Sequence, residues 1–286
     1  MLRPMRCDTH VHVVGAIERY PQIPTRTYLA GPAPLDALRR LGAERGVTRF
    51  VLVQPSFYGA DNTLLLDSLD VLGGGGRGVA VIDPQAASPD ELAAWAGHGV
   101  CGLRLNLYST AAGRGAGALD RAFRTMAALA RPLGWHVEVI AAHGVLTESA
   151  DAIARADVPV VVDHYGLYGA AGPASAEGRR LLDLFARPNV WVKLSGPYRV
   201  SADPLNTRPD RAWLAAILGV AAERCVWGSD WPHTPPHELQ TDGAMPLPYR
   251  ALSYPRLVDD FIAAVNSSEL AERVLQDNPA RLYGFL

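Results

Sequence analysis

The stretch Arg6-Cys7-Asp8-Thr9-His10-Val11-His12-Val13 has the alternating pattern of side chains that is typical of a β-strand. Because successive side chains of a strand point to opposite faces, His10 and His12 share one face and Val11 and Val13 share the other. Two imidazoles side by side can hold a divalent metal ion or polarise a substrate oxygen. Taken alone, the pair could equally be two polar residues at the end of a strand.

Further apolar runs of strand length follow this stretch, and segments with apolar residues at helical spacing separate them. Such alternation of strands and helices is typical of an α/β fold, the (β/α)₈ or TIM barrel. We therefore expect residues 1–286 to form a single barrel domain. The eight expected strands are Arg6–Val13, Phe50–Gln54, Gly78–Asp83, Val100–Leu107, Trp135–Ile140, Val158–His164, Val190–Ser195 and Cys225–Asp230.

Composition and charge narrow the classes of function. The 286 residues, 49% of them hydrophobic, suffice for one large α/β domain. The formal net charge of -2 offers no basic surface to nucleic acid. No apolar run approaches the roughly 20 residues of a membrane span, and the N-terminal residues do not resemble a secretion signal. We therefore expect a cytoplasmic enzyme with a small-molecule substrate and neither nucleic acid nor membrane as partner; the sequence carries no signal for oligomeric state.

Polar residues gather at the carboxyl ends of three expected strands. His10 and His12 belong to the first strand, His164 ends the sixth and Asp230 ends the eighth. In a closed barrel the first and eighth strands are neighbours, so Asp230 would lie beside the histidine pair. Each residue has a structural alternative, because Asp230 could cap the following turn and His164 could be a buried polar group with its own partner. Four such residues at one end of the barrel favour a shared site.

Four motifs of the chain are Thr9-His10-Val11-His12, Asp163-His164-Tyr165-Gly166, Gly228-Ser229-Asp230-Trp231-Pro232-His233 and Asn278-Pro279-Ala280-Arg281-Leu282-Tyr283-Gly284. They resemble motifs of the amidohydrolase superfamily, and within it of the amidohydrolase 2 group. The resemblance spans nearly the whole chain. It implies a TIM barrel and a hydrolase that opens a small lactone or related cyclic ester, as the 2-pyrone-4,6-dicarboxylate hydrolases do. The group also implies an alternative, the metal-dependent non-oxidative decarboxylation of the aminocarboxymuconate-semialdehyde decarboxylases.

The resemblance also implies catalytic roles. Asp230 is the implied general base that activates water, and His10, His12 and His164 are the implied cluster that polarises the lactone carbonyl. In the metal-bearing members of the group these histidines bind zinc instead. Both arrangements are chemically sound, because a carboxylate can accept a proton from water and either a cation or an imidazole N–H can stabilise the oxyanion.

Candidate substrate-binding residues follow from the same comparison. Arg104 matches an arginine that binds a substrate carboxylate in the pyrone hydrolases, and Arg199 is a second candidate, because a guanidinium can make two hydrogen bonds to a carboxylate. A surface ion pair is the alternative for both arginines. Asn106 shares the strand face of Arg104. Ser56 and Tyr58, just past the second strand, could donate hydrogen bonds to substrate, with loop packing as the alternative for Tyr58.

A metal ion is expected from the charge of the site. Glu138 adds a carboxylate on the fifth strand, and Leu167 stands where the pyrone hydrolases carry an arginine. Fewer guanidinium groups and more carboxylates favour a bound cation. We expect one zinc or manganese ion, while metal-independent catalysis stays open. Glu138 could instead form an ion pair with Arg104 on the neighbouring strand. The expected ligands are His10, His12, His164 and Asp230, with Glu138 as a further candidate.

Two other hypotheses use different chemistry. Lys193, the only lysine of the chain, could form a Schiff base as in aldolase-like barrels, but this would leave the histidines and Asp230 without a role. A barrel that only binds a ligand would be expected to lack a catalytic group, whereas all four motif positions are present.

Overall fold

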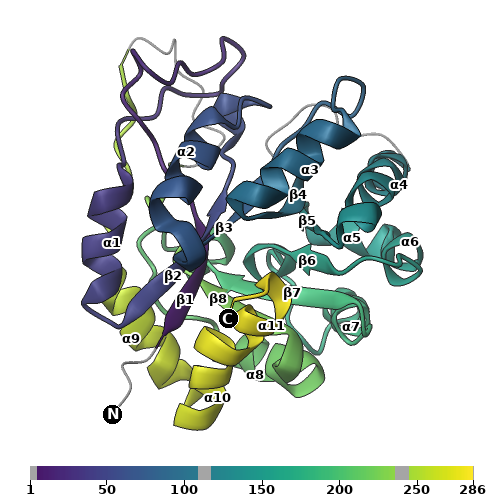
Figure 1. Cartoon of the computed structure of the whole chain (residues 1–286). Helices are drawn as coiled ribbons and strands as arrows, with labels where there is room; N and C mark the ends of the chain where they lie inside the picture. The colour runs from purple at the N-terminus through teal and green to yellow at the C-terminus, as the bar shows by residue number, and fades with distance from the viewer. Residues whose placement is uncertain (1–4, 109–116, 236–244, 286) are drawn as a thin grey trace.

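The computed structural model describes residues 5–108, 117–235 and 245–285. Eight parallel strands form one sheet in chain order, and helices surround it, as Figure 1 shows. The predicted (β/α)₈ barrel is therefore confirmed. The strands are β1 (Arg6–Val11), β2 (Val47–Val53), β3 (Gly76–Ala80), β4 (Val100–Asn106), β5 (His136–Ile140), β6 (Val160–Val162), β7 (Val190–Ser195) and β8 (Cys225–Gly228).

Backbone hydrogen bonds join the first strand to the segment that follows the last. The amide of Asp230 donates to the carbonyl of His10 at 2.9 Å, and the amide of His12 donates to the carbonyl of Trp231 at 2.8 Å. These bonds bring Asp230 beside the two histidines, as expected for a closed barrel.

Polar side chains that precede α3 and α8 stabilise the first turns of these helices. Ser88 caps α3 by accepting from the amide of Glu91, and Asp210 caps α8 by accepting from the amides of Ala212 and Trp213. No helix among the described residues is long and apolar enough to cross a bilayer. The helices are α1 (Leu35–Ala43), α2 (Thr63–Leu72), α3 (Pro89–His98), α4 (Ala118–Ala130), α5 (His143–Glu148), α6 (Ala150–Ala154), α7 (Ala176–Phe185), α8 (Arg211–Ala221), α9 (Tyr254–Val265), α10 (Ser268–Glu272) and α11 (Asn278–Tyr283).

The C-terminal tail covers the end of the barrel where the strands begin. The ring of Phe285 packs against the guanidinium groups of Arg77 and Arg49. The Cζ atoms of these arginines lie 4.7 and 5.3 Å from the centre of the Phe285 ring. Arg77 also donates to the carbonyl of Tyr283 at 2.8 Å. A functional site is therefore expected at the opposite end of the barrel, where the strands finish.

Six of the eight expected strands end one to three residues earlier than the sequence pattern suggests, and β1 ends at Val11, one residue before His12. β6 stops at Val162 and β8 at Gly228, before His164 and Asp230. His164 and Asp230 both have left-handed backbone, with φ of 50° and 60°. Such strained backbone is uncommon outside glycine and concentrates at functional sites, where it aims a side chain that a regular strand would point elsewhere.

Candidate active site

The four residues predicted to share a site meet at the carboxyl end of the barrel. His10 Nε2 and His12 Nε2 lie 3.8 and 3.6 Å from Asp230 Oδ1. The centre of the His10 ring lies 4.6 Å from that of His164. All four side chains are buried. The structure thus brings the four together, while the roles of base and carbonyl-polarising cluster stay predictions.

One oxygen of the Asp230 carboxylate accepts hydrogen bonds, and the other faces the histidines. Its Oδ2 accepts hydrogen bonds from the Tyr198 hydroxyl, at 2.6 Å, and from Arg199 Nε. Its Oδ1 has no hydrogen-bond partner within the described parts of the chain and faces the histidines. Burial raises the pKa of Asp230, but Arg199 and His164 outweigh it and hold that pKa well below its usual value. Asp230 is therefore an ionised carboxylate with one oxygen ready to accept a proton.

Main-chain partners orient two of the imidazoles. His12 Nδ1 donates to the carbonyl of Val53 at 2.7 Å, which directs its Nε2 towards Asp230. His164 Nδ1 lies 3.3 Å from the carbonyl of Ser195 and 2.9 Å from its hydroxyl. Burial lowers the pKa of His164 to about 4, so this imidazole is neutral near pH 7.

Beneath His10 lies a buried charged group that we call the inner cluster, made of Lys193, Glu138 and Asp163. Lys193 Nζ donates to Glu138 Oε2 and lies 3.6 Å from Asp163 Oδ1 and 3.2 Å from His10 Nδ1. Burial and the Lys193 ammonium hold the pKa of His10 well below its usual value, so its ring is neutral. Burial and Asp163 raise the pKa of Glu138, but Lys193 and nearby imidazoles outweigh them and lower it.

The inner cluster changes three expectations. Glu138 binds Lys193 and belongs to neither group of potential metal ligands among the described residues, so the expected fifth ligand lies below the site. The alternative pair with Arg104 does not form, because Arg104 Nη1 donates to the carbonyl of Gln54 at 2.7 Å. Lys193 is fully buried under His10, which leaves the Schiff-base hypothesis without an accessible amine.

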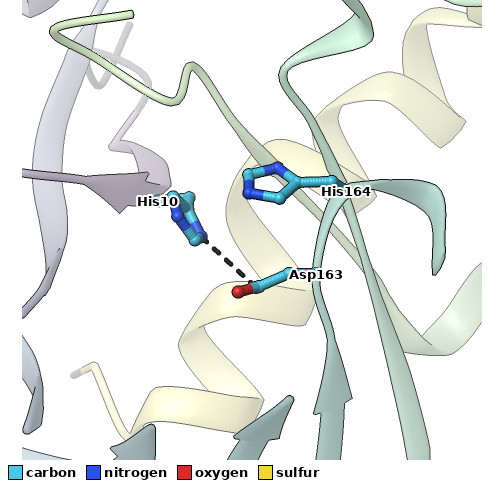
Figure 2. A group of neighbouring side chains, drawn as sticks. All are labelled: His10, Asp163 and His164. Carbon is cyan, nitrogen blue, oxygen red and sulfur yellow. Dashed lines mark ion pairs between the residues drawn. The ribbon is translucent and has the colours of Figure 1, made fainter. Parts of the chain in front are cut away.

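Asp163 is a candidate functional residue that was not predicted from the sequence. Its position was the available signal, since it directly precedes His164 at the end of a strand. Figure 2 shows Asp163 and His164 pointing from the end of β6 towards His10 on β1. The three side chains offer ligand atoms within 4.8 Å of one another.

A narrow pocket opens above the histidines. Arg199 Nη2 donates to the Thr234 hydroxyl at 2.8 Å, while Arg104 Nε is buried without a hydrogen-bond partner among the residues that the structure describes. Tyr58 lies outside the pocket and accepts from the amide of Gly15 at 3.2 Å, which agrees with the loop-packing alternative. The lining includes the predicted residues Ser56, Arg104, Asn106 and Arg199, together with His12, Tyr28, Pro55, Phe57, Ile140, His164 and Thr234.

The residues present fit a divalent ion. One nitrogen each from His10 and His12 and a carboxylate oxygen of Asp230 lie within 4.8 Å of one another. Within the described ranges, His10 Nε2 and Asp230 Oδ1 are buried without hydrogen-bond partners, as expected of atoms that receive a ligand. Imidazole nitrogen and carboxylate oxygen are also the donors that zinc accepts.

The sequence of this barrel is similar to those of known proteins. The sequence profile of the amidohydrolase family matches residues 7–285. The chain belongs to the amidohydrolase family. The resemblance noted in the sequence is therefore confirmed over nearly its whole length.

Relatives of this amidohydrolase include lactone hydrolases. It is 31% identical to the 4-sulfomuconolactone hydrolase of Rhizobium radiobacter, over 98% of this chain and 90% of the relative. It is 30% identical to the 2-pyrone-4,6-dicarboxylate hydrolase of Comamonas testosteroni, over 96% of this chain and 89% of the relative. A solved Pseudomonas putida structure, described as a candidate 2-pyrone-4,6-dicarboxylic acid hydrolase, has a TM-score of 0.79 at 31% identity, covering 99% of both chains.

Proposed function

We propose that this amidohydrolase opens a small lactone, or a related cyclic ester, with water activated by Asp230. The observation that carries the proposal is the buried Asp230 carboxylate, which keeps one oxygen open towards three histidines at the end of a barrel. The relatives named above support the reaction class, because both are lactone hydrolases. They give no support to the decarboxylase alternative. We also propose that residues 1–286 act as one domain.

The first step is attack by water. Tyr198 and Arg199 hold Asp230 Oδ2, so Oδ1 accepts the proton while the water oxygen bonds to the carbonyl carbon. The carbonyl oxygen becomes an oxyanion, and an imidazole N–H at this place stabilises it. When the tetrahedral intermediate collapses, the ring C–O bond breaks. The leaving oxygen then takes the proton from Asp230, which yields a hydroxy acid and restores the carboxylate.

We further propose that the lactone carries a carboxylate or a similar anionic oxygen group. Two guanidinium groups line the pocket, those of Arg104 and Arg199. The Asp230 carboxylate already balances Arg199. Arg104 has a carbonyl partner at one nitrogen and an unpartnered buried Nε within the described residues, so an anionic substrate oxygen would complete its hydrogen bonding. Ser56 and Asn106 line the same pocket as further hydrogen-bonding groups.

A zinc or manganese ion remains part of the proposal. His10, His12 and Asp230 would hold it, and His164 lies beside them. When bound, such an ion would polarise the carbonyl or lower the pKa of water.

A panel of acidic and neutral lactones tests the function. The purified protein should open an acidic lactone to its hydroxy acid, identified by mass spectrometry, and each assay is run with and without chelator. Release of carbon dioxide in place of ring opening would instead support the decarboxylase. Folded protein that opens no lactone across a panel of five- and six-membered rings would contradict the proposal.

A further inference from the structure

The two nitrogens of His10 face different surroundings. Nε2 faces Asp230 Oδ1 at 3.8 Å, where water and the lactone carbonyl would meet. Nδ1 faces the inner cluster, with Lys193 Nζ at 3.2 Å and Asp163 Oδ1 at 3.3 Å. Because a neutral imidazole carries one proton, the partner of Nδ1 decides what Nε2 can do.

Lys193 and Asp163 require opposite hydrogen-bonding roles of His10 Nδ1. An ammonium group can only donate a hydrogen bond, and a carboxylate can only accept one. The contact between Lys193 Nζ and His10 Nδ1 has hydrogen-bond geometry. The contact with Asp163, the dashed line in Figure 2, is an ion-pair distance, and neither Asp163 oxygen has a hydrogen-bond partner in the described parts of the chain. The geometry therefore favours Lys193 as the partner of Nδ1.

We infer that Lys193 is a positioning residue that sets the tautomer of His10. By donating to Nδ1, it keeps the ring proton on Nε2, where the N–H can stabilise the oxyanion of the proposed lactone hydrolysis; this catalytic part of the inference rests on the proposed function. If Nδ1 donates to Asp163 instead, Nε2 offers a lone pair that can ligate a metal ion. The choice between Lys193 and Asp163 is thus a choice between a hydrogen-bond donor and a metal ligand, and the ion proposed above would bind His10 only with the ring proton moved to Nδ1.

The inner cluster explains why Lys193 can stay in this place. Its side chain is fully buried, and a buried ammonium is stable only beside carboxylates. Glu138 accepts from Nζ on one side, and Asp163 Oδ1 lies 3.6 Å away on another. Glu138 therefore anchors Lys193 against His10, a task in the barrel interior that is distinct from metal ligation.

A charge-balanced variant tests the inference. The single substitution Lys193→Met would leave two buried carboxylates without a cation. We therefore combine it with Glu138→Gln, so that the double variant loses one positive and one negative charge. Glu138→Gln alone is the matched control, because the amide oxygen of glutamine can still accept from Lys193 and Asp163 still balances its charge. His10→Asn identifies the His10 signals in the spectra described next.

The first readout is ¹⁵N NMR of histidine-labelled, metal-free protein. Wild type and Glu138→Gln should carry the His10 proton on Nε2, and the double variant should carry it on Nδ1. The second readout is calorimetric titration of chelator-stripped protein with zinc. We expect the double variant to bind zinc at least about tenfold more tightly than the control, since loss of the hydrogen-bond partner of a ligating histidine typically changes metal affinity by about 10- to 100-fold.

The third readout is turnover of metal-free enzyme, which should fall on the order of 10²-fold in kcat with a smaller change in KM, as for loss of an oxyanion donor. The NMR and zinc experiments need no lactone, so they stand even if the proposed function fails. A wild-type His10 with its proton on Nδ1 would overturn the inference, whether or not the double variant folds. So would a folded double variant with unchanged tautomer and zinc affinity.

Discussion

Arg199 and Asp230, separated by 31 residues in the chain, form a buried ion pair in which Arg199 Nε donates to Asp230 Oδ2. The pair leaves Oδ1 directed at the histidines and keeps the carboxylate ionised. Arg199 also lines the narrow pocket above the histidines. Arg199 therefore orients the proposed base from the lining of the pocket, and the base and the pocket can be tested separately.

Removing the basicity of Asp230 should nearly abolish activity. Asp230→Asn keeps the shape of the side chain but leaves water without a proton acceptor, so kcat should fall by about 10²- to 10⁴-fold. Steady-state assays of ring opening measure this, with circular dichroism as the check of folding. Asp90→Asn, at an exposed position in the first turn of α3, is the control and should keep wild-type turnover. Near-normal kcat in folded Asp230→Asn would rule out the assignment of the base.

Removing Arg199 should change the pH dependence of the reaction. Arg199 lowers the pKa of Asp230, so Arg199→Met should raise that pKa and move the acid limb of kcat/KM to higher pH. The sign follows because the base works only when ionised, and a higher pKa demands a higher pH for ionisation. Rates of metal-free enzyme measured across the acid range provide the test. The exposed Arg208→Met is the control, and an acid limb shared by all three proteins would disprove the coupling.

Arg104 should discriminate between charged and neutral substrates. Arg104→Met removes a hydrogen bond to an anionic group, and such bonds contribute about 1.5–3 kcal/mol. We therefore expect KM to rise about 10- to 100-fold for an acidic lactone and far less for its neutral analogue. The comparison uses one pair of lactones that differ only in a carboxylate and its methyl ester. An equal change for both would show that Arg104 has a structural role.

His233 should make the protein sensitive to acid. Burial lowers its pKa to about 4, and neither ring nitrogen has a hydrogen-bond partner among the described residues. Between the ordinary histidine value and about pH 4, the unfolded chain therefore binds a proton that the folded chain does not. As pH falls through this window, His233 lowers the free energy of unfolding, by roughly 2 kcal/mol between pH 7 and pH 5.

The variant His233→Asn removes that titration and suits the left-handed backbone, where φ is 68°. Urea unfolding at pH 7 and pH 5 should show a smaller loss of stability in the variant than in wild type. His164, whose pKa is also lowered to about 4, is present in both proteins and cancels from the comparison. Identical losses would mean that His233 does not contribute to acid sensitivity.

The sequence by itself determined the barrel and the main residues of the site. Strand periodicity is a local property, so β7 (Val190–Ser195) is predicted with the bounds that the structure shows. The order of elements then placed the ends of β1 and β8 together. That order alone predicts that His10 and His12 lie beside Asp230, as the backbone hydrogen bonds between these segments show.

Only the tertiary structure decided the partners of these side chains. Arg104 and Glu138 are register neighbours on β4 and β5, and the sequence therefore allowed an ion pair between them. Glu138 instead binds Lys193 on β7, beneath His10 on β1. The reason is that inward-pointing residues of alternate strands stack in common layers inside a TIM barrel. A contact across such a layer depends on strand tilt and register around the whole barrel, which a local sequence pattern does not contain.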